Sequence, residues 1–408
     1  MATSLECLPA EETQLRWQRA RRLMQALLPD AGGLLLSSPL TIYYFTGTLG
    51  SGLFWLPLEG EPVLLVRKGL ERTLLESPLR HIRRFRSYKE LPGLCAEEGS
   101  PLPDGKSASV AVDMKHFSWE QSGMLMSRVP SLRFVPGDAV VARTRAVKTP
   151  WELNKMRLAG ERHNRCMREV LPGILHPGMS EREISLAALA AFNDEGHGGM
   201  VRLSGGGVSP GSASVGESGL YATNFDGPLG TRGLHPSLPF AGDAGTIWKR
   251  GQLLTLDMGF VLEGYNTDKT QTYWAGSDPV DPEVQRAHDV CEEILHATSE
   301  ALKPGAVPSA IWQRAQEQAA AAGYGEQFMG VGPERVRFLG HGIGLNMDEF
   351  PAFAKGFDLP LEEGMTVALE PKIGLPGLGM PGVENTFEIT ADGARSLSGT
   401  DWSLIVIG

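Results

Sequence analysis

Two strand-like runs joined by a short turn constrain the fold of this chain more than any other feature. The runs cover residues 253–260 and 267–274, and residues 262–264 (Leu-Glu-Gly) lie between them. Apolar and β-branched residues bounded by turn residues predict an antiparallel β-hairpin. Each strand carries one aspartate, Asp257 in the first and Asp268 in the second.

The register of this hairpin decides how close the two aspartates come. If Val261 faces Gly264 across the turn, Asp257 lies directly opposite Asp268, where Cβ atoms are about 4.5–5.5 Å apart. Two buried carboxylates that close repel each other, and a divalent cation between them removes the conflict. The hairpin alone fits a solvent-facing acidic pair, or two carboxylates that share a proton, equally well.

Three later segments add side chains that bind metals. His341 stands between two glycines, which leave room for a ligand or another backbone beside it. Glu370 ends the apolar run 365–370 and is followed by a proline, which stops a strand. Glu384 is the second residue of the run 383–389, which predicts a return strand that brings it beside Glu370. Each of the three, taken alone, is compatible with a structural or surface role.

Together these segments supply four carboxylates and one imidazole, from Asp257, Asp268, His341, Glu370 and Glu384. An oxygen-rich set of this kind suits Mn, Fe, Co or Zn better than a thiolate-type site would. Four carboxylates exceed what one metal usually needs, so the set predicts two divalent ions bridged by acids. Such a pair can bind a shared hydroxide at neutral pH and polarise a carbonyl oxygen.

Composition excludes several other classes of protein. The 408 residues carry a formal net charge of -10, whereas a nucleic-acid binder needs a cationic face. The four cysteines fit no zinc or redox spacing, which predicts free thiols in a reducing compartment. No signal peptide and no membrane-spanning run is recognisable. We therefore expect a cytoplasmic protein with no membrane and no nucleic-acid partner.

The chain is expected to contain two domains, residues 1–145 and 146–408. In the first, we expect helices at 11–28 and 116–129. Short apolar runs predict strands at 33–36, 42–45, 54–57, 63–66 and 110–112.

Residues 143–151 resemble a hinge, after which Thr149 can cap a new helix. The region 195–245 is rich in Gly, Pro and Ser, and its aromatic and aliphatic residues favour an ordered, functional loop. Further helices are expected at about 150–170, 180–193, 281–302 and 308–322.

The order Asp-x10-Asp, Gly-His-Gly-Ile-Gly, Leu-Glu-Pro and Val-Glu-Asn resembles the pita-bread metallopeptidases. That family comprises methionine aminopeptidases, Xaa-Pro aminopeptidases and prolidases. The segment before the linker resembles the longer, creatinase-like branch. The resemblance implies an α+β fold, with a pita-bread catalytic domain preceded by a smaller α/β creatinase-like N-terminal domain. It also implies a homodimer that removes the N-terminal residue of peptides, often before proline.

The resemblance also implies roles for the five ligands. Asp257 and Asp268 would bind one metal, with Asp268 bridging. His341 and Glu370 would bind the other, and Glu384 would bridge both. Glu370 would move a proton from the nucleophilic water to the leaving amine.

The chain departs from the family pattern at several positions. Asp348 stands where a second histidine, a substrate contact, usually follows His341 by seven residues. Gly382 stands where an arginine is common. For the family's upstream active-site histidine, which contacts substrate, the best candidate is His235, and His197 is a weaker one.

The sequence therefore predicts a dinuclear Xaa-Pro aminopeptidase or Xaa-Pro dipeptidase. Three alternatives stay open: a metal-free creatinase-like C–N hydrolase, a metal-dependent enzyme of this fold acting on a non-peptide substrate, such as a lyase, and a binding protein without activity.

Overall fold

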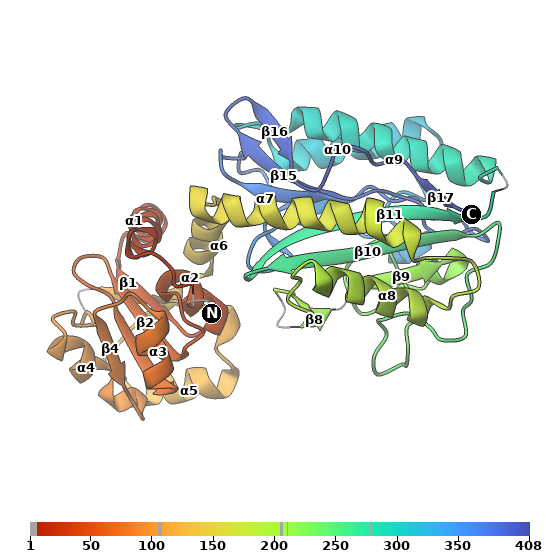
Figure 1. The fold of residues 1–408 in the computed structure, drawn as a ribbon. Coiled ribbons are helices and arrows are strands. Elements are labelled where there is room, and N and C mark those ends of the chain that lie inside the picture. Colours follow the sequence, from red (N-terminus) through yellow and green to blue (C-terminus); the bar gives the residue numbers. More distant parts are fainter. Residues whose placement is uncertain (1–5, 105–107, 205–206, 210, 278) are drawn as a thin grey trace. The chain divides into compact units, whose positions relative to one another are not determined.

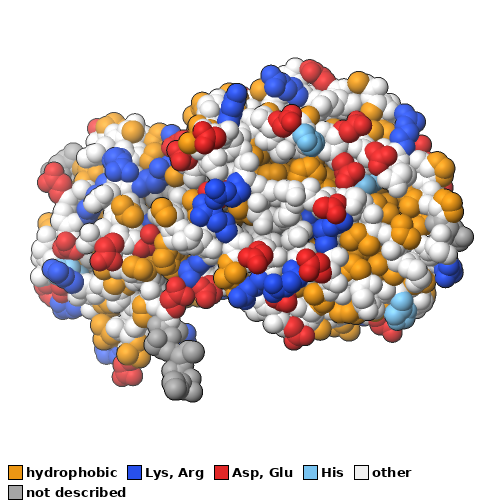
Figure 2. Space-filling model, turned by 45° about the horizontal axis from the view of Figure 1, so that its top comes forward, with side chains coloured by type: hydrophobic (Ala, Val, Ile, Leu, Met, Phe, Trp, Pro, Cys, Tyr) orange, Lys and Arg blue, Asp and Glu red, His pale blue; other side chains and the backbone are white. Residues whose placement is uncertain are grey.

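The computed structural model describes residues 6–104, 108–204, 207–209, 211–277 and 279–408. The chain divides into two compact units, Met1–Arg145 and Ala146–Gly408, each described by itself here. Among the described residues, no helix is both long and apolar enough to cross a bilayer. On the face drawn in Figure 2, acidic and basic side chains are intermingled instead of forming a continuous basic surface.

The first unit is built on one six-stranded mixed sheet, in the order β4-β3-β2-β1-β5-β6 (Figure 1). The apolar side chains of its central strands are fully buried and form the core of this unit. Its elements are α1 (Ala10–Leu27), β1 (Ala31–Leu36), α2 (Pro39–Thr46), β2 (Ser51–Pro57), β3 (Val63–Lys68), α3 (Leu70–Glu76), β4 (His81–Arg84), α4 (Leu91–Glu97), β5 (Ser109–Val112), α5 (Trp119–Arg128), β6 (Phe134–Pro136) and α6 (Asp138–Ala146).

One predicted strand of this unit is wrong, because residues 42–45 belong to helix α2. The side chain of Ser38 caps the helix by accepting a hydrogen bond from the Thr41 amide. Gly47 ends it in the left-handed conformation, with φ of 78°. A short run of mostly buried apolar residues fits a strand and a helix equally well. The capping residues at its two ends are what identify this segment as a helix.

The second unit contains two larger sheets, each covered by a pair of helices (Figure 1). The strand orders are β17-β11-β10-β9 and β13-β12-β14-β15-β16. Helices α7 and α8 pack on the first sheet, and α9 and α10 pack on the second. Its elements are α7 (Pro150–Arg165), α8 (Glu181–Asp194), β7 (Val201–Arg202), β8 (Val208–Ser209), β9 (Ser212–Val215), β10 (Leu253–Leu262), β11 (Tyr265–Ala275), α9 (Pro282–Ala301), α10 (Pro308–Ala321), β12 (Phe338–Gly342), β13 (Glu349–Ala354), β14 (Thr366–Leu369), β15 (Asn385–Thr390), β16 (Gly393–Ser396) and β17 (Ile405–Ile407).

Helix α7 begins as the sequence predicts. Thr149 accepts a hydrogen bond from the Glu152 amide, and the Glu152 carboxylate accepts one from the Thr149 amide. This reciprocal capping box satisfies two amide groups that the first turn cannot. The helix therefore starts at Pro150, directly after the linker.

The hairpin of β10 and β11 forms, but its predicted register is wrong. Leu262 pairs with Tyr265, so the turn consists of Glu263 and Gly264 alone. Both turn residues have positive φ, 50° and 91°. Two residues of that kind make the tight turn that matches the twist of antiparallel strands.

In this register Asp257 faces Thr270, and Asp268 faces Gly259. The two aspartates are therefore offset by two residues instead of being directly opposed. Because the side-chain period of a strand is two, an offset of two keeps them on the same face of the sheet. They are diagonal neighbours, within reach of a common ligand.

Candidate metal centre

One face of β11 points toward the second sheet. The hydroxyl of Thr270 donates to Oε2 of Glu384 (2.9 Å), and the hydroxyl of Thr272 donates to the carbonyl of Gly382 (2.7 Å). Asp268 lies on this same face, two residues before Thr270. The alternation of the strand therefore directs its acidic side chain toward the return segment that carries Glu384.

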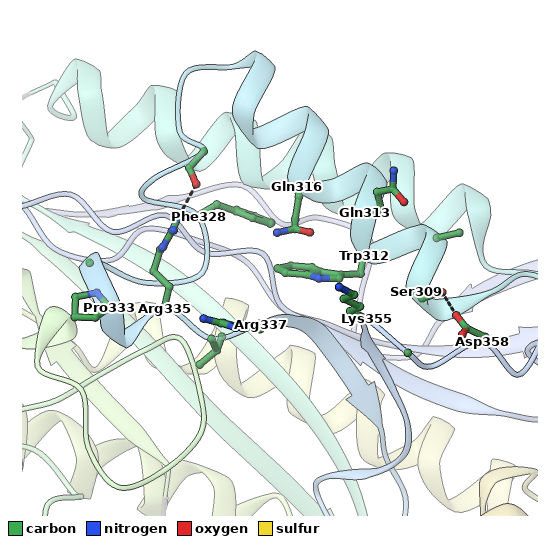
Figure 3. A pocket seen from close by; sticks show the side chains of 15 residues that line it. Ser309, Trp312, Gln313, Gln316, Phe328, Pro333, Arg335, Arg337, Lys355 and Asp358 are labelled. Atoms are coloured by element: carbon green, nitrogen blue, oxygen red, sulfur yellow. Dashed lines mark hydrogen bonds between the residues drawn. The ribbon is translucent and has the colours of Figure 1, made fainter.

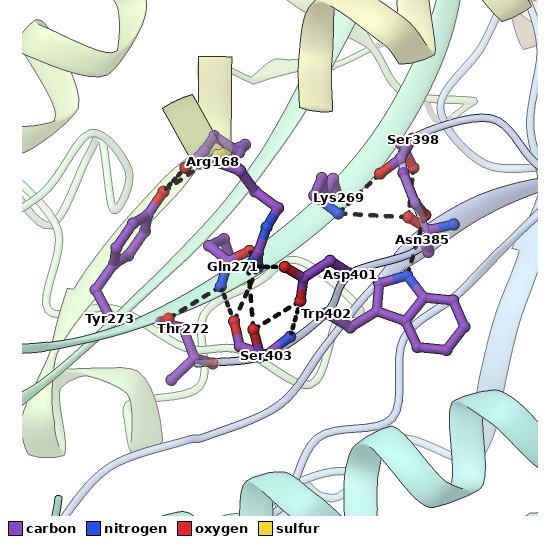
Figure 4. Close-up of polar contacts among 12 residues, drawn as sticks. Arg168, Lys269, Gln271, Thr272, Tyr273, Asn385, Ser398, Asp401, Trp402 and Ser403 are labelled. Carbon is purple, nitrogen blue, oxygen red and sulfur yellow. Dashed lines mark hydrogen bonds and ion pairs between the residues drawn. The ribbon is translucent and has the colours of Figure 1, made fainter. Parts of the chain in front are cut away.

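The opposite face of β11 is held by a separate polar network, drawn in Figure 4. The ammonium of Lys269 donates to the carbonyl of Ser398 (2.8 Å), and Gln271 donates to the carbonyl of Ser403 (3.0 Å). Because these bonds tie the strand to the C-terminal segment, they fix the rotation of β11 and with it the direction of Asp268.

The two sheets of the second unit meet at Asp268. Thr386, on β15, accepts a hydrogen bond from the Asp268 amide (2.8 Å) and donates one to the Asp268 carbonyl (2.9 Å). On the neighbouring strands Leu369 pairs with Asn385. The next positions along this antiparallel register are Glu370 and Glu384, which therefore lie side by side at the ends of β14 and β15.

His341 enters the same space from β12. Its Nδ1 is 3.0 Å from the carbonyl of Gly342, so this nitrogen carries the proton, and Nε2 lies 3.9 Å from Oε1 of Glu370. The flanking glycines are needed because neighbouring backbones approach closely. A Cβ at Gly340 would lie 2.0 Å from the carbonyl oxygen of Ala368.

All five predicted ligands are thus brought together, in two groups that share one glutamate. The first group is Asp268, His341 and Glu384, and the second is Asp257, Glu370 and Glu384. Within each group the candidate ligand atoms lie within 4.8 Å of one another. We call these five residues the cage.

Burial makes the cage electrostatically unfavourable without a cation. Burial, followed by repulsion from Asp257, raises the pKa of Asp268 to about 7. Burial and the neighbouring acids also raise the pKa of Glu384 and of Glu370. Oε1 of Glu384 is buried without a hydrogen-bond partner among the described residues. An unfilled acceptor beside Asp268 and His341 is what a metal ligand requires, so the first group fits a divalent ion.

The second group already has a cationic partner, which the sequence interpretation missed. The ammonium of Lys372 lies 2.9 Å from Glu370, 3.3 Å from Glu384 and 3.3 Å from Asp257. Burial alone would lower the pKa of Lys372, but the three carboxylates outweigh it and hold the pKa well above its usual value. The signal was available in the sequence, because Lys372 stands two residues after Glu370 in an extended segment. The second group, as it stands, does not fit another cation.

Asp348 is held by a loop far away in the sequence. Its carboxylate accepts hydrogen bonds from the amide of Ser204 (2.7 Å) and from the Ser204 hydroxyl. Ser204 lies in the region 195–245, which is ordered where it is described and contributes β9 to the first sheet. This contact fixes the position of a negative charge next to β13.

The two candidate loop histidines are placed differently. His235 is exposed, and its Nδ1 contacts Ser237 within the same loop. His197 is buried, and its Nδ1 accepts a hydrogen bond from the Val261 amide. Neither belongs to the two groups of ligand atoms that form the cage.

A cleft of about 890 Å³ lies beside α10, and none of the residues that line it belongs to the cage (Figure 3). The rings of Trp312 and Phe328 stack there with centroids 6.0 Å apart. Cationic side chains line it as well, from Arg335, Arg337 and Lys355.

Known protein families match both parts of the chain. Residues 154–391 match metallopeptidase family M24, and residues 16–147 match the creatinase/prolidase N-terminal domain. The Xaa-Pro dipeptidase of Pyrococcus furiosus is 24% identical over 376 residues, which cover 91% of this chain and 94% of that protein. The Xaa-Pro dipeptidase of Lactobacillus helveticus is 28% identical over 267 residues, 65% of this chain and 64% of that protein.

Solved structures share the fold. The dipeptidase PepE of Mycobacterium ulcerans superposes with a TM-score of 0.78 at 22% identity, over 98% of this chain and all of that one. An X-Pro aminopeptidase from Thermotoga maritima gives a TM-score of 0.75 at 23% identity, over 95% and 99% of the two chains. The predicted two-domain fold and family resemblance are confirmed. With its M24 match covering more than half of its length, this chain belongs to metallopeptidase family M24.

Proposed function

We propose that the protein is an Xaa-Pro dipeptidase or Xaa-Pro aminopeptidase, which removes the N-terminal residue from peptides with proline in the second position. The observation that carries this proposal is the cage, in which one histidine and four carboxylates converge. One buried oxygen of Glu384 accepts no hydrogen bond from any described residue. The names of the relatives supply the substrate class.

The proposed metal site is built around Asp268, His341 and Glu384. A divalent ion bound there lowers the pKa of a coordinated water and polarises a carbonyl oxygen. Mn, Co, Fe and Zn all suit this donor set. Asp257 and Glu370 would complete a second site, as expected for two ions, if Lys372 did not already bind them.

Glu370 is proposed to transfer the proton. Its carboxylate lies at the edge of the cage, with Oε2 bonded to Lys372 and Oε1 facing His341. Burial raises its pKa, which brings a carboxylate closer to the proton affinity that acid–base catalysis at neutral pH requires. Glu370 would accept a proton from the attacking water and deliver it to the leaving amine.

Substrate contacts are assigned to Asp348 and His235. Asp348 replaces a histidine of the family pattern and carries negative charge, so its partner on the substrate must be a donor, such as an amide or an ammonium group. His235 is exposed on its loop, and we assign it as a second substrate contact.

Peptide cleavage after chelation and metal replacement tests the function. The purified protein is stripped, reloaded with Mn, Co or Zn, and given Xaa-Pro dipeptides, Xaa-Pro tripeptides and matched Xaa-Ala peptides. We expect metal-dependent cleavage of the proline series, and cleavage of tripeptides but not dipeptides would mark an aminopeptidase. Loss of activity in His341→Ala would tie the cleavage to the cage.

Asp348 also favours a second candidate function. A negative charge where the family has a histidine would repel a developing oxyanion. This suits a metal-dependent enzyme of the same fold that acts on a non-peptide substrate, such as a lyase. Metal binding without cleavage of any peptide in the panel would select this candidate.

We also propose a cytoplasmic homodimer. The four cysteines are free thiols, and Cys95, Cys166 and Cys291 are buried, as suits a reducing compartment. The dimer is taken from the family pattern alone. Light scattering during size-exclusion chromatography tests it, because a monomer of 44.1 kDa is well separated from a dimer.

A further inference from the structure

Lys372 is surrounded by the acids that would hold a second metal. Its Nζ is within 3.3 Å of one oxygen from each of Asp257, Glu370 and Glu384, and its side chain is 0% exposed. We propose that the ammonium of Lys372 permanently takes the place of one cation, so that the enzyme binds a single divalent metal at Asp268, His341 and Glu384. The inference rests on the proposed function only in that the cage binds metal.

The path of the lysine side chain is built into the local backbone. Lys372 and Gly382 form a β-bridge, and a Cβ at Gly382 would lie 2.6 Å from Cγ of Lys372 and 2.7 Å from the carbonyl of Pro371. Any side chain at position 382 would collide with backbone and with the base of the lysine side chain. The arginine common at this position in the family would not fit beside Lys372. The observed path of the Lys372 side chain therefore requires glycine at position 382.

The ammonium and a second metal would compete for the same oxygens. Metal-to-carboxylate bonds are about 2.0–2.2 Å long. An ammonium 2.9–3.3 Å from one oxygen of each acid lies in the space between them that such a metal would need. Displacing it would move a charged group away from its partners at a position closed to solvent, which is strongly unfavourable.

The two groups of ligands differ in what they lack. In the second group, the ammonium contacts all three acids. In the first group, Oε1 of Glu384 has no hydrogen-bond partner among the residues that the structure describes. One dication at the first group, together with Lys372, would bring the four carboxylates from a charge of -4 to -1. The carboxylate oxygen that still lacks a cationic partner therefore belongs to the group that contains His341.

The number of bound metals tests the inference without any assay of activity. Wild-type protein is stripped, titrated with Mn²⁺, and analysed by calorimetry, elemental analysis and electron paramagnetic resonance. We expect one tightly bound Mn²⁺ per chain with the spectrum of an isolated ion. Two tight sites with the spin coupling of a close pair would overturn the inference and leave the proposed peptidase function intact.

The variant Lys372→Ala removes the ammonium and opens space. We expect the number of Mn²⁺ ions bound by this variant to rise to two per chain, with spin coupling between the two ions. The matched control is Lys148→Ala, which removes another buried lysine, whose ammonium bonds to the Ala146 carbonyl and to Glu349. The control should keep a count of one.

The remaining outcomes are equally decisive. A folded Lys372→Ala protein that still binds one ion would overturn the role of the lysine. The wild-type measurements settle the count by themselves, whether or not the variant folds. A wild type with one Mn²⁺ that cleaves no peptide would contradict the proposed function and support the inference.

Discussion

Two glutamates of the second unit, Glu181 and Glu384, are equally buried but have different hydrogen-bond partners. Glu181 is 0% exposed and Glu384 is 1% exposed. Both oxygens of Glu181 accept backbone amides, from Val215 (2.7 Å) and from Asp243 (2.9 Å). Within the described part of the chain, Glu384 has hydrogen-bond partners on Oε2 and none on Oε1.

The difference separates a structural carboxylate from a functional one. Burial raises the pKa of both side chains, so neither burial nor the direction of the pKa shift distinguishes them. What distinguishes them is how completely their acceptor positions are filled. Asp113 of the first unit belongs with Glu181, since its oxygens accept the amides of Ser37 and Ser38.

Glu384→Gln should have the largest effect, because both groups of the cage share this residue. Removing a hydrogen-bond partner of a metal ligand already lowers metal affinity or activity by about 10–100-fold. We therefore expect loss of the shared ligand itself to lower kcat/KM by about 10³-fold, which corresponds to about 4 kcal/mol. The metal-free variant should melt no lower than the metal-free wild type, since an amide removes a buried charge with an unfilled acceptor.

Kinetics on an Xaa-Pro peptide and thermal melting after chelation measure both effects of Glu384→Gln. An active variant with a clearly lower Tm would place Glu384 with Glu181 among the structural carboxylates, and the comparison would fail.

Asp113 allows the comparison to be tested through pH. Burial raises its pKa to about 7 against the opposing effect of the amides of Ser38 and Ser37. A carboxyl whose pKa is higher in the folded than in the unfolded protein loses stability as pH rises from its unfolded pKa to its folded pKa. Between pH 5 and 7.5, the free energy of unfolding of the wild type should fall by about 2 to 3 kcal/mol more than that of Asp113→Asn.

Urea unfolding at the two pH values measures this difference, in which the contribution of the cage cancels because both proteins carry the same cage. An equal pH dependence in wild type and variant would show that Asp113 is ionised at both pH values.

The sequence predicted most of the fold because its long elements have clear periodic patterns and caps. Helix α7 begins with the predicted cap at Thr149, and both strands of the hairpin are present. The strand predicted at 42–45 was wrong because a segment this short, in which every residue but Tyr43 is buried, shows no periodicity. The hairpin register was wrong by two positions, and because two is the period of a strand, Asp257 and Asp268 stayed on one face.

The part of the site that could be predicted from the sequence is the set of residues whose side chains are typical metal ligands. The five cage residues converge as expected, because Asp257 and Asp268 share one face of the hairpin, Glu370 and Glu384 stand at strand ends, and His341 lies between two glycines. The reach of the Lys372 side chain and the contact between Ser204 and Asp348, 144 positions apart, depend on tertiary packing. A single sequence carries no pattern for contacts of that kind.

Glu181→Gln should have an intermediate effect, on stability instead of activity. The glutamine keeps one acceptor oxygen, but its amide nitrogen faces either the Val215 or the Asp243 amide, and one buried donor loses its partner. We expect a loss of about 1 to 2 kcal/mol in the free energy of unfolding, with the number of bound metal ions unchanged. Denaturant unfolding measures the loss, and Glu363→Gln, at an exposed position, is the control that should change nothing. A lost metal ion in the Glu181 variant would mean that this residue supports the cage directly.

Ser204→Ala should have the smallest effect, because it removes one of the two bonds that hold Asp348. The hydroxyl is lost, while the backbone amide of residue 204 still donates to the carboxylate. This bond is exposed to solvent, so its net contribution is that of an ordinary hydrogen bond, about 0.5–1.5 kcal/mol. We therefore expect KM for a peptide to rise by about 3- to 10-fold, with kcat and the metal count unchanged. Asp348→Asn, which removes the charge and keeps the shape, should raise KM further. If Ser204→Ala lowers kcat or the metal count while leaving KM unchanged, then Asp348 supports the cage, and the contrast between filled and unfilled carboxylates extends to a third position near the site.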